Sequence, residues 1–280
     1  MSTTITNKAF LLLADGTHYE GKAIGKVGTT VGEICFNTGM TGYQEVFTDP
    51  SYFGQIMVTT NNHIGNYGVR EEETESSGVK IAGLVCKKFS GHQSREMAQS
   101  SLDDYFMENN VVGISDVDTR EIVRHVRDKG AMNAIISSEV LDLKELKAKL
   151  DQLPSMEGME LATKVSTDEP YEQGEANAQY KVAVLDFGLK SNIVRCLNDR
   201  GCHTKVFNAN TSFEELKAWN PDGIMLSNGP GDPEPLAGPI KTVQRIIEAN
   251  IPVFGICLGH QILCLAMGMK TFKMHNGHRG

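Results

Sequence analysis

Residues 251–260 read IPVFGICLGH, which places a cysteine between an apolar run and a glycine. The apolar run is short enough for a strand, and the following residues, HQILCLAMG, have the apolar spacing of a helix. Cys257 therefore falls at the junction of the two. Because glycine tolerates sharp turns and close approaches, Gly255 and Gly259 allow the chain to reverse there. The stretch predicts a buried strand, a tight turn that carries the cysteine, and a helix.

The same succession of a strand and a helix repeats over residues 180–280. Strand-like runs (KVAVLDFG, HTKVFNA, GIMLS and IPVFGI) alternate with helix-like runs (SNIVRCLNDRG, SFEELKAWN, GPIKTVQRIIEAN and HQILCLAMG). This alternation predicts right-handed crossovers and a doubly wound parallel sheet. Ligands of such sheets gather outside the carboxyl ends of the strands, where Cys257 would lie.

Residues 1–165 follow another pattern. Glycines and β-forming residues alternate through GTHYEGKAIGKVGTTVGEICFNTGMTGYQEVF, which predicts hairpins and short strands. Later in this half, Asp118 can cap a helix that Gly130 ends. We expect a mixed α+β domain over 1–165. A polar, acidic linker over 166–179 should join it to the α/β domain over 180–280.

Composition and charge restrict the class of protein. The chain has 280 residues, 40% of them hydrophobic, with a net charge of −8 and a pI near 5.5. A chain without a basic stripe is a poor partner for nucleic acid. Its apolar runs are too short to span a bilayer, and its N-terminus does not fit a secretory or transit peptide. We therefore expect a cytoplasmic protein that binds neither membrane nor nucleic acid.

The six cysteines are dispersed and form no CxxC pair, which favours reduced thiols over disulfides or a metal site. Cys257 has a further interpretation, because G-I-C-L-G is the cysteine counterpart of the G-x-S-x-G nucleophile elbow. A helix N-terminus beside the sulfur would favour the thiolate, and the backbone N–H groups there could bind a developing oxyanion.

The elbow alone does not separate a nucleophile from a small core residue such as Cys264. The loop SNGPGDP also follows a strand, and it carries Gly229 and Gly231 around a proline. Bare backbone in this loop could approach a ligand. Two such loops at the ends of strands in one sheet favour the functional interpretation of Cys257.

Three segments of the second half, VLDFGLKSNI, SNGPGDP and GICLGHQ, together resemble the triad-type glutamine amidotransferases. The first half contains FNTGMTGYQEVFTDPSYFGQIM, NHIGNYGV and DVDTREIVRHVRDKGAMNAII. These stretches look like the small, glutamine-hydrolysing subunit of carbamoyl-phosphate synthase. The resemblance covers nearly the whole chain, with both halves in the expected order.

The resemblance implies a role for each matching position. Cys257 is similar to the nucleophile that attacks the glutamine side-chain amide, giving a glutamyl thioester and ammonia. The backbone N–H groups of Gly231 and Leu258 match the oxyanion hole. The substrate-binding positions implied by the resemblance are Ser51, Gly229, Gly231, Leu258 and Gln261.

The resemblance also implies a partner. A large synthetase subunit would accept the ammonia and carry ATP and Mg²⁺ for carbamoyl phosphate synthesis, which serves arginine and pyrimidine biosynthesis. The chain itself is expected to hold no cofactor. The stretch GTHYEGKA nearly fits a P-loop, but Ala23 stands where a Ser or Thr should hold magnesium. The expected assembly is a heterodimer in which residues 1–165 dock the large subunit.

The general base is the point of departure from the family pattern. The family takes a histidine and its orienting glutamate from an H-P-E segment, which residues 1–280 do not contain. The resemblance therefore implies an amidotransferase domain that is incomplete at its C-terminus and impaired when alone. His260 is expected to face away from Cys257. Two other functions stay open: a non-catalytic docking module, and another elbow-type cysteine hydrolase such as a peptidase.

Overall fold

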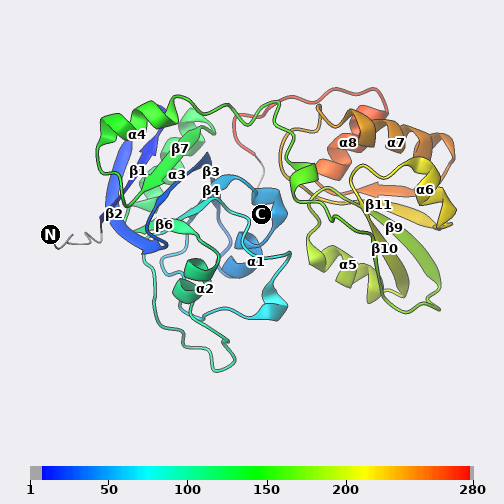
Figure 1. Ribbon diagram of the computed structural model, residues 1–280, viewed down its shortest axis with the longest axis horizontal. Helices are drawn as coiled ribbons and strands as arrows, with labels where there is room; N and C mark the ends of the chain where they lie inside the picture. Colours follow the sequence, from blue (N-terminus) through cyan, green and yellow to red (C-terminus); the bar gives the residue numbers. More distant parts are fainter. Residues whose placement is uncertain (1–7, 278–280) are drawn as a thin grey trace. The chain divides into compact units, whose positions relative to one another are not determined.

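The computed structural model describes residues 8–277, which fold into two compact units (Figure 1). Unit 1 holds the residues up to Thr48, Gly54–Ser155 and the residues from Met274 on, and unit 2 holds Asp49–Phe53 and Met156–Lys273.

Unit 1 is built on a closed seven-stranded barrel in the order β1-β2-β6-β5-β4-β3-β7. Its interior is filled by aliphatic side chains, among them Leu11, Ile34, Ile56 and Ile114. The strands are β1 (Lys8–Leu13), β2 (His18–Gly25), β3 (Thr29–Asn37), β4 (Gln55–Thr59), β5 (Gly83–Val85), β6 (Val112–Ser115) and β7 (Asn133–Ser137). The helices are α1 (Tyr43–Phe47), η2 (Glu71–Glu73), α2 (Leu102–Glu108), α3 (Thr119–Lys129) and α4 (Leu143–Leu150).

The pairing of these strands is less local than the sequence suggested. β1 and β2 form a hairpin, but β2 pairs with β6 and not with β3. The pairs β3–β4, β4–β5 and β5–β6 are all parallel, so they require crossovers rather than tight turns. The barrel closes where β1 pairs with β7. Hairpins therefore account for only part of the sheet of unit 1, because most of its strand pairs join strands that are distant in sequence.

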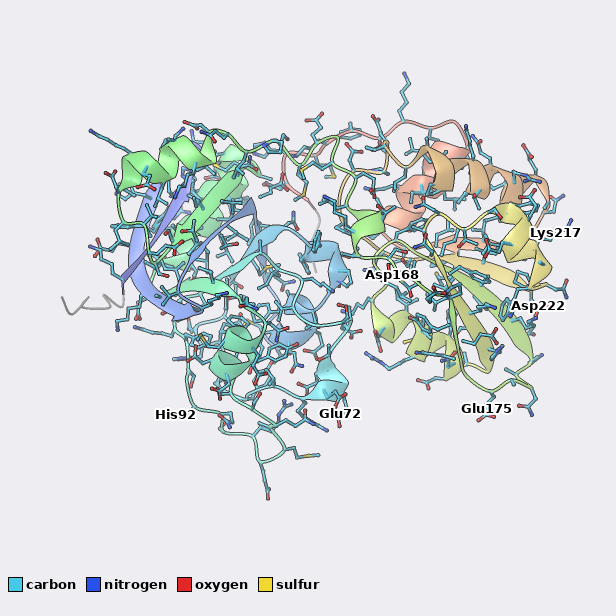
Figure 2. All side chains as sticks on the ribbon, in the orientation of Figure 1. Glu72, His92, Asp168, Glu175, Lys217 and Asp222 are labelled. Carbon is cyan, nitrogen blue, oxygen red and sulfur yellow. The ribbon has the colours of Figure 1, made fainter. Side chains whose placement is uncertain are left out.

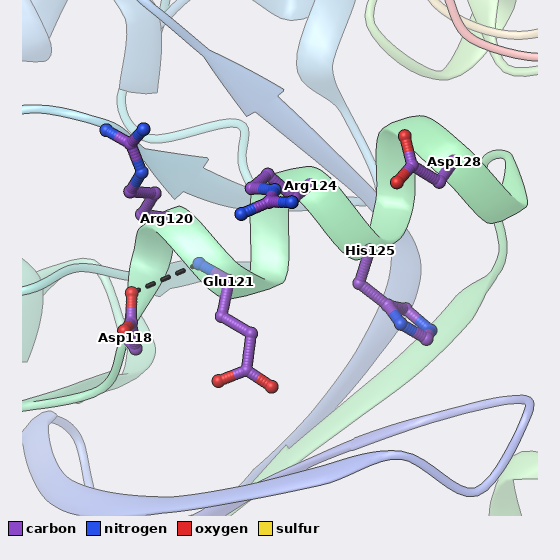
Figure 3. Close-up of a pocket in the computed structure, with 6 residues that line it drawn as sticks. All are labelled: Asp118, Arg120, Glu121, Arg124, His125 and Asp128. Carbon is purple, nitrogen blue, oxygen red and sulfur yellow. Dashed lines mark hydrogen bonds between the residues drawn. The ribbon is translucent and has the colours of Figure 1, made fainter.

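Helix α3 follows the sequence prediction. The carboxylate of Asp118 accepts a hydrogen bond from the backbone N–H of Glu121 at 3.1 Å, which caps the helix (Figure 3). Ile122 and Val126 are buried in the barrel core. Gly130, at φ +94°, ends the helix in a conformation that favours glycine.

Unit 2 is an α/β sheet of five strands in the order β12-β11-β9-β10-β8. β9 pairs in parallel with both β10 and β11, and β11 pairs in parallel with β12. The strands are β8 (Tyr171–Gln173), β9 (Tyr180–Asp186), β10 (Cys202–Asn208), β11 (Gly223–Leu226) and β12 (Val253–Gly255). The helices are η1 (Pro50–Tyr52), η3 (Ala162–Lys164), α5 (Ser191–Asn198), α6 (Phe213–Ala218), α7 (Ala237–Glu248) and α8 (Leu258–Ala266).

Alternate residues of the central strand β9 face two separate cores, as a doubly wound sheet requires. Ala183 and Leu185 join a core that also takes side chains from α6, α7 and α8. Val184 joins a smaller core with Val194 of α5. Figure 1 shows α5 on one face of this sheet and α7 and α8 on the other. The predicted doubly wound arrangement is confirmed.

The boundaries differ from the expected 1–165, 166–179 and 180–280. The division between the units falls at Ser155 and Met156. The stretch expected as a linker contains β8, which pairs antiparallel with β10, so the sheet is mixed and not wholly parallel. The polar composition of β8 hid this strand, because all three of its residues are exposed at the sheet edge.

The strand after Ile251 is less buried than its apolar sequence predicted. Among the described strands β12 pairs only with β11, so it forms an edge of the sheet. Phe254 is 63% exposed there, and Phe272, further along the chain, is 85% exposed. Apolar surface of this strand is therefore uncovered among the described residues. Within the described residues, no helix is long and apolar enough to cross a membrane.

The β8 edge is held by an ion-paired carboxylate, which makes its stability depend on pH. Glu172 contacts His203 at 2.8 Å and Lys205 at 3.1 Å. The hydrogen bond with His203, followed by the one with Lys205, lowers the pKa of the Glu172 carboxyl. Because the unfolded pKa of Glu is about 4.3, the pair stabilises the folded state above that pH. The contribution is lost as the pH falls through the lower folded pKa.

We expect Glu172→Gln to speed hydrogen exchange of the β8 amides at pH 6, and to have a smaller effect as the pH falls through the lowered folded pKa of Glu172. The increase should not exceed about fivefold, since exposed ion pairs contribute roughly 0–1 kcal/mol. Glu175→Gln is the control, because this exposed carboxylate of the same segment has no ion pair among the described residues (Figure 2). Equal exchange of wild type and Glu172→Gln at pH 6 would contradict the assignment.

Candidate active site

The carboxyl ends of β9, β11 and β12 meet at one edge of the unit 2 sheet. Leu226 pairs with Leu185 on one side and with Gly255 on the other. The segments that follow these strands are therefore neighbours, as expected for a doubly wound sheet. They begin at Phe187, Ser227 and Ile256.

Cys257 occupies the turn between β12 and α8, where the sequence placed it. Its backbone has φ +53° and ψ −112°, a conformation that non-glycine residues rarely adopt. Such strain costs of order 1–3 kcal/mol and persists only where the surroundings enforce it. The residue is exposed, and α8 begins immediately after it. The predicted strand, turn and helix are confirmed, and the strained turn presents a thiol at a helix N-terminus.

Two glycines enforce this turn by close backbone packing. A Cβ atom on Gly259 would lie 2.3 Å from the carbonyl oxygen of Leu226, and one on Gly255 would lie 2.6 Å from the carbonyl carbon of Gly259. No real Cβ approaches another atom so closely. The N–H of Gly259 donates to the carbonyl oxygen of Ser227 at 3.0 Å. The first turn of α8 is thereby fixed against the end of β11.

The two N–H groups expected to form an oxyanion hole are oriented by local structure. Leu258 is the first residue of α8, where a backbone N–H has no partner within the helix. Gly231, at φ +85°, is bridged to Glu160 in antiparallel fashion. Among the described residues, neither N–H donates to a protein acceptor. Both are therefore free to bind a developing negative charge.

Close packing leaves room only for a glycine at position 229. A Cβ atom here would lie 2.0 Å from the carbonyl oxygen of Phe187 and 2.9 Å from the Leu258 side chain. The loop after β11 therefore touches both the loop after β9 and the first turn of α8. Gln261, one turn along α8, has an exposed side chain, and its N–H donates to the carbonyl oxygen of Cys257 at 3.1 Å.

Ser51 belongs to unit 2, although the sequence assigned it to the N-terminal domain. It lies in η1, whose N-cap Asp49 accepts the Ser51 N–H at 2.9 Å. The Ser51 hydroxyl accepts a hydrogen bond from the side chain of Asn228 at 2.8 Å. The sheet edge thus brings together all of the predicted substrate-binding positions: Ser51 lies beside the loop that carries Gly229 and Gly231, and this loop adjoins the start of α8.

Two residues of this edge were missed by sequence reasoning. The carboxylate of Asp186 is buried and accepts the N–H groups of Gly188 at 2.8 Å and Leu189 at 2.7 Å, which shapes the turn after β9. The buried side chain of Asn228 contacts two other segments of the chain, at Lys190 and at Asp49 and Ser51. Their position was the signal available in the sequence: Asp186 directly follows the apolar residues of β9, and Asn228 lies two residues after the end of β11.

The ring of His260 contacts a cysteine of α8, Cys264. Its Nε2 lies 3.6 Å from the sulfur of Cys264, one turn further along α8. This contact agrees with the prediction that the ring faces away from Cys257.

The remaining thiols differ in access. Cys35 and Cys86 are buried, Cys202 and Cys264 are partly exposed, and Cys196 is exposed. Burial raises the pKa of the Cys86 thiol well above its usual range, so this group stays protonated. Cys196 is therefore the main competitor of Cys257 for reagents that alkylate exposed thiols.

A separate charged hollow lies on helix α3 of unit 1 (Figure 3). Its lining residues are Asp118, Arg120, Glu121, Arg124, His125 and Asp128. It contains no cysteine or serine nucleophile and none of the site positions predicted from the sequence. Within residues 8–277, no group of three or more His, Cys, Asp or Glu side chains is arranged to hold a metal ion.

Comparison with known families supports the division into two functional parts. Residues 11–136 match the family model of the carbamoyl-phosphate synthase small chain, CPSase domain. Residues 183–280 match the family model of the class-I glutamine amidotransferases. The first match covers the barrel of unit 1, and the second covers the sheet edge that carries Cys257.

Individual relatives resemble the chain over its whole length. It is 46% identical to the carbamoyl phosphate synthase small chain of Synechococcus sp., an alignment that covers 100% of this chain and 75% of that protein. It is 48% identical to the protein of the same name from Vibrio cholerae, covering 99% of this chain and 77% of the relative.

We expect Cys257 to be the cysteine that a glutamine-like chloroketone alkylates fastest, because it combines exposure with a helix N-terminus. Peptide mapping after brief labelling of the folded protein measures this. Iodoacetamide, which carries no amino-acid group, is the control and should also label exposed Cys196. Equal chloroketone labelling of Cys257 and Cys196, Cys202 or Cys264 would contradict the assignment.

Gly259→Ala should destabilise unit 2 by about 1–3 kcal/mol, since the new methyl group would overlap the Leu226 carbonyl. The only tryptophan, Trp219, lies in unit 2, so its fluorescence during urea unfolding measures the change. Gly238→Ala is the matched control. Its Cβ, within helix α7, would lie no closer than 4.0 Å to the Asn210 side chain, and the free energy of unfolding should rise by up to about 1 kcal/mol. Similar effects of the two substitutions would refute the packing argument.

Proposed function

Because the chain belongs to the family of carbamoyl-phosphate synthase small chains, we propose that it hydrolyses the side-chain amide of L-glutamine through a thioester on Cys257. The observation that carries this proposal is the strained backbone of Cys257 at φ +53°, at the N-terminus of α8. A protein keeps such strain where the position of one side chain matters. As a member of this family, the chain is a glutamine-hydrolysing amidotransferase subunit of the synthase.

The proposed chemistry has two stages. The Cys257 thiolate attacks the amide carbon of glutamine, forming a C–S bond and a tetrahedral oxyanion. The C–N bond then breaks and the nitrogen takes up a proton. Ammonia departs, and a glutamyl thioester remains on Cys257. Water attacks the thioester, the C–S bond breaks, and glutamate is released with the thiol restored.

The surrounding residues support each stage. The N–H groups of Gly231 and Leu258 stabilise the oxyanion, and a single such donor is typically worth about 3–4 kcal/mol in acyl transfer. Gln261 and Ser51 contact glutamine at the rim of the site, and Gly229 allows the loop after β11 to pack against α8. His260, engaged with Cys264, leaves the proton transfers to another group.

The ammonia passes to a large synthetase subunit. Carbamoyl phosphate formation requires phosphorylated intermediates, and the proposal assigns ATP and Mg²⁺ to that partner. The stretch that nearly fits a P-loop lies in the turn after β1 and in β2, and no helix follows it directly. Carbamoyl phosphate then serves arginine and pyrimidine biosynthesis. Unit 1, matched by the small-chain domain model, supplies docking surface in a cytoplasmic heterodimer.

The test combines the intact chain with a cognate large subunit, and measures glutamate release and carbamoyl phosphate formed from glutamine or from added ammonia. We expect Cys257→Ser to abolish both glutamine-dependent products and to leave ammonia-dependent synthesis intact. Cys264→Ser, on the same helix, is the matched control and should retain glutamine use. Retained glutamine hydrolysis by Cys257→Ser would contradict the thioester.

Other outcomes of the same experiment address the alternatives. Association without glutamine hydrolysis by the wild-type chain would favour a non-catalytic docking module. Carbamoyl phosphate formed from ATP by the chain alone would overturn the division of labour.

Hydrogen exchange of the complex locates the docking surface. A deletion of residues 1–165 is unsuitable for this purpose, because it would also remove Ser51 and the first residues of unit 2. Protection confined to unit 2 would refute docking by unit 1.

A further inference from the structure

Asn228 is a buried amide at the end of β11 whose side chain joins three segments that are distant in sequence. It is 5% exposed. Its Oδ1 accepts the backbone N–H of Lys190 at 2.9 Å. Its Nδ2 donates to the Ser51 hydroxyl oxygen at 2.8 Å and to Oδ1 of Asp49 at 3.2 Å. The function proposed above assigns no role to this residue.

The partners of Asn228 fix the orientation of its amide. The backbone N–H of Lys190 can only donate, so Oδ1 must face it. The Asp49 carboxylate can only accept when ionised, so the NH₂ group must face the loop that carries Asp49 and Ser51. A flipped amide would set a donor against a donor and an acceptor against an acceptor.

This orientation determines what the Ser51 hydroxyl can offer. A serine hydroxyl has one proton to donate and oxygen lone pairs that accept. The NH₂ group of Asn228 has no lone pair for that proton, so the Ser51 oxygen is the acceptor in this contact. Within the described residues, the Ser51 proton is given to no acceptor. It is available for a ligand.

We propose that Asn228 is a positioning residue that holds the Ser51 hydroxyl as a donor toward the α-carboxylate of glutamine. The inference rests on the proposed function, which puts the side-chain amide of glutamine at Cys257 and leaves its amino-acid end for Ser51. At that end the carboxylate is the only acceptor, because an ammonium group has only protons to donate. The Lys190 ammonium lies 3.8 Å from the Asp49 carboxylate and offsets its negative charge beside this subsite.

Asn228→Asp tests this polarity with almost no change in shape. The new carboxylate would still accept the Lys190 N–H, but its second oxygen would accept the Ser51 proton, which would then be lost to the ligand. The same oxygen would face Asp49, so folding is monitored through Trp219 fluorescence. Ser51→Ala removes the donor outright, and Ser51→Thr retains a hydroxyl.

The experiment measures alkylation of Cys257 in the intact chain, by peptide mapping, with three probes. One is a chloroketone analogue of glutamine that carries the α-carboxylate and α-ammonium groups. The second is its counterpart without the carboxylate, and the third is iodoacetamide. In each case a C–S bond forms as the halide leaves, so the reaction reports binding and thiol reactivity without requiring turnover of glutamine.

We expect Asn228→Asp and Ser51→Ala each to slow alkylation by the carboxylated chloroketone roughly tenfold, the size of a hydrogen bond to a charged group. Neither should change the rate with the other two probes. The double variant should be no slower than Ser51→Ala, because Asn228 acts through Ser51, and Ser51→Thr should keep most of the wild-type rate.

Three results would overturn the proposal: an unchanged rate for folded Asn228→Asp, an equal loss with the probe that lacks the carboxylate, or additive effects in the double variant. If Asn228→Asp does not fold, the Ser51 variants decide, and a Ser51→Ala protein that still prefers the carboxylated probe rejects the inference. Failure of the proposed function looks different. In that case wild-type Cys257 would show no preference for the carboxylated probe and no protection by L-glutamine.

Discussion

The contact between Gly259 and the Leu226 carbonyl is the constraint on which the candidate site depends. A Cβ atom at residue 259 would lie 2.3 Å from that oxygen, so only glycine lets α8 begin against the end of β11. Gly255 makes a comparable approach from the other side of the turn. Between them Cys257 is held at φ +53°, a strained conformation paid for by the packing of α8 into the sheet core.

The neighbouring loops depend on the same close packing. Gly229 fits between the Phe187 carbonyl and the Leu258 side chain, so the loops after β9 and β11 and the start of α8 are in mutual contact. Asp186 and Asn228 satisfy backbone N–H groups that these sharp turns leave without ladder partners. The result is a rigid edge, which suits chemistry that needs oxyanion donors fixed in advance.

The Asn228 amide shows how a buried polar group can determine the character of an exposed one. Its oxygen faces a group that can only donate, the backbone N–H of Lys190, and its NH₂ group faces an acceptor, the Asp49 carboxylate. These two partners fix the direction of the hydrogen bond to Ser51. A short segment, Asp49–Phe53, thereby becomes part of unit 2, although it lies between two parts of unit 1 in sequence. The polarity of the subsite is set by residues that need not touch the ligand.

The sequence by itself determined the strand-turn-helix at Cys257, the doubly wound sheet and the capped helix α3, because each depends on local spacing of apolar residues, glycines and caps. The resemblance of its motifs also identified the family. Tertiary structure alone decided the barrel closure, the β8 edge strand, the exposure of β12 and the placement of Ser51 in unit 2. These features rest on pairings between residues far apart in the chain. The physical reason is that a strand's partner and a side chain's hydrogen-bond direction are set by whatever the fold brings opposite them, which local sequence does not encode.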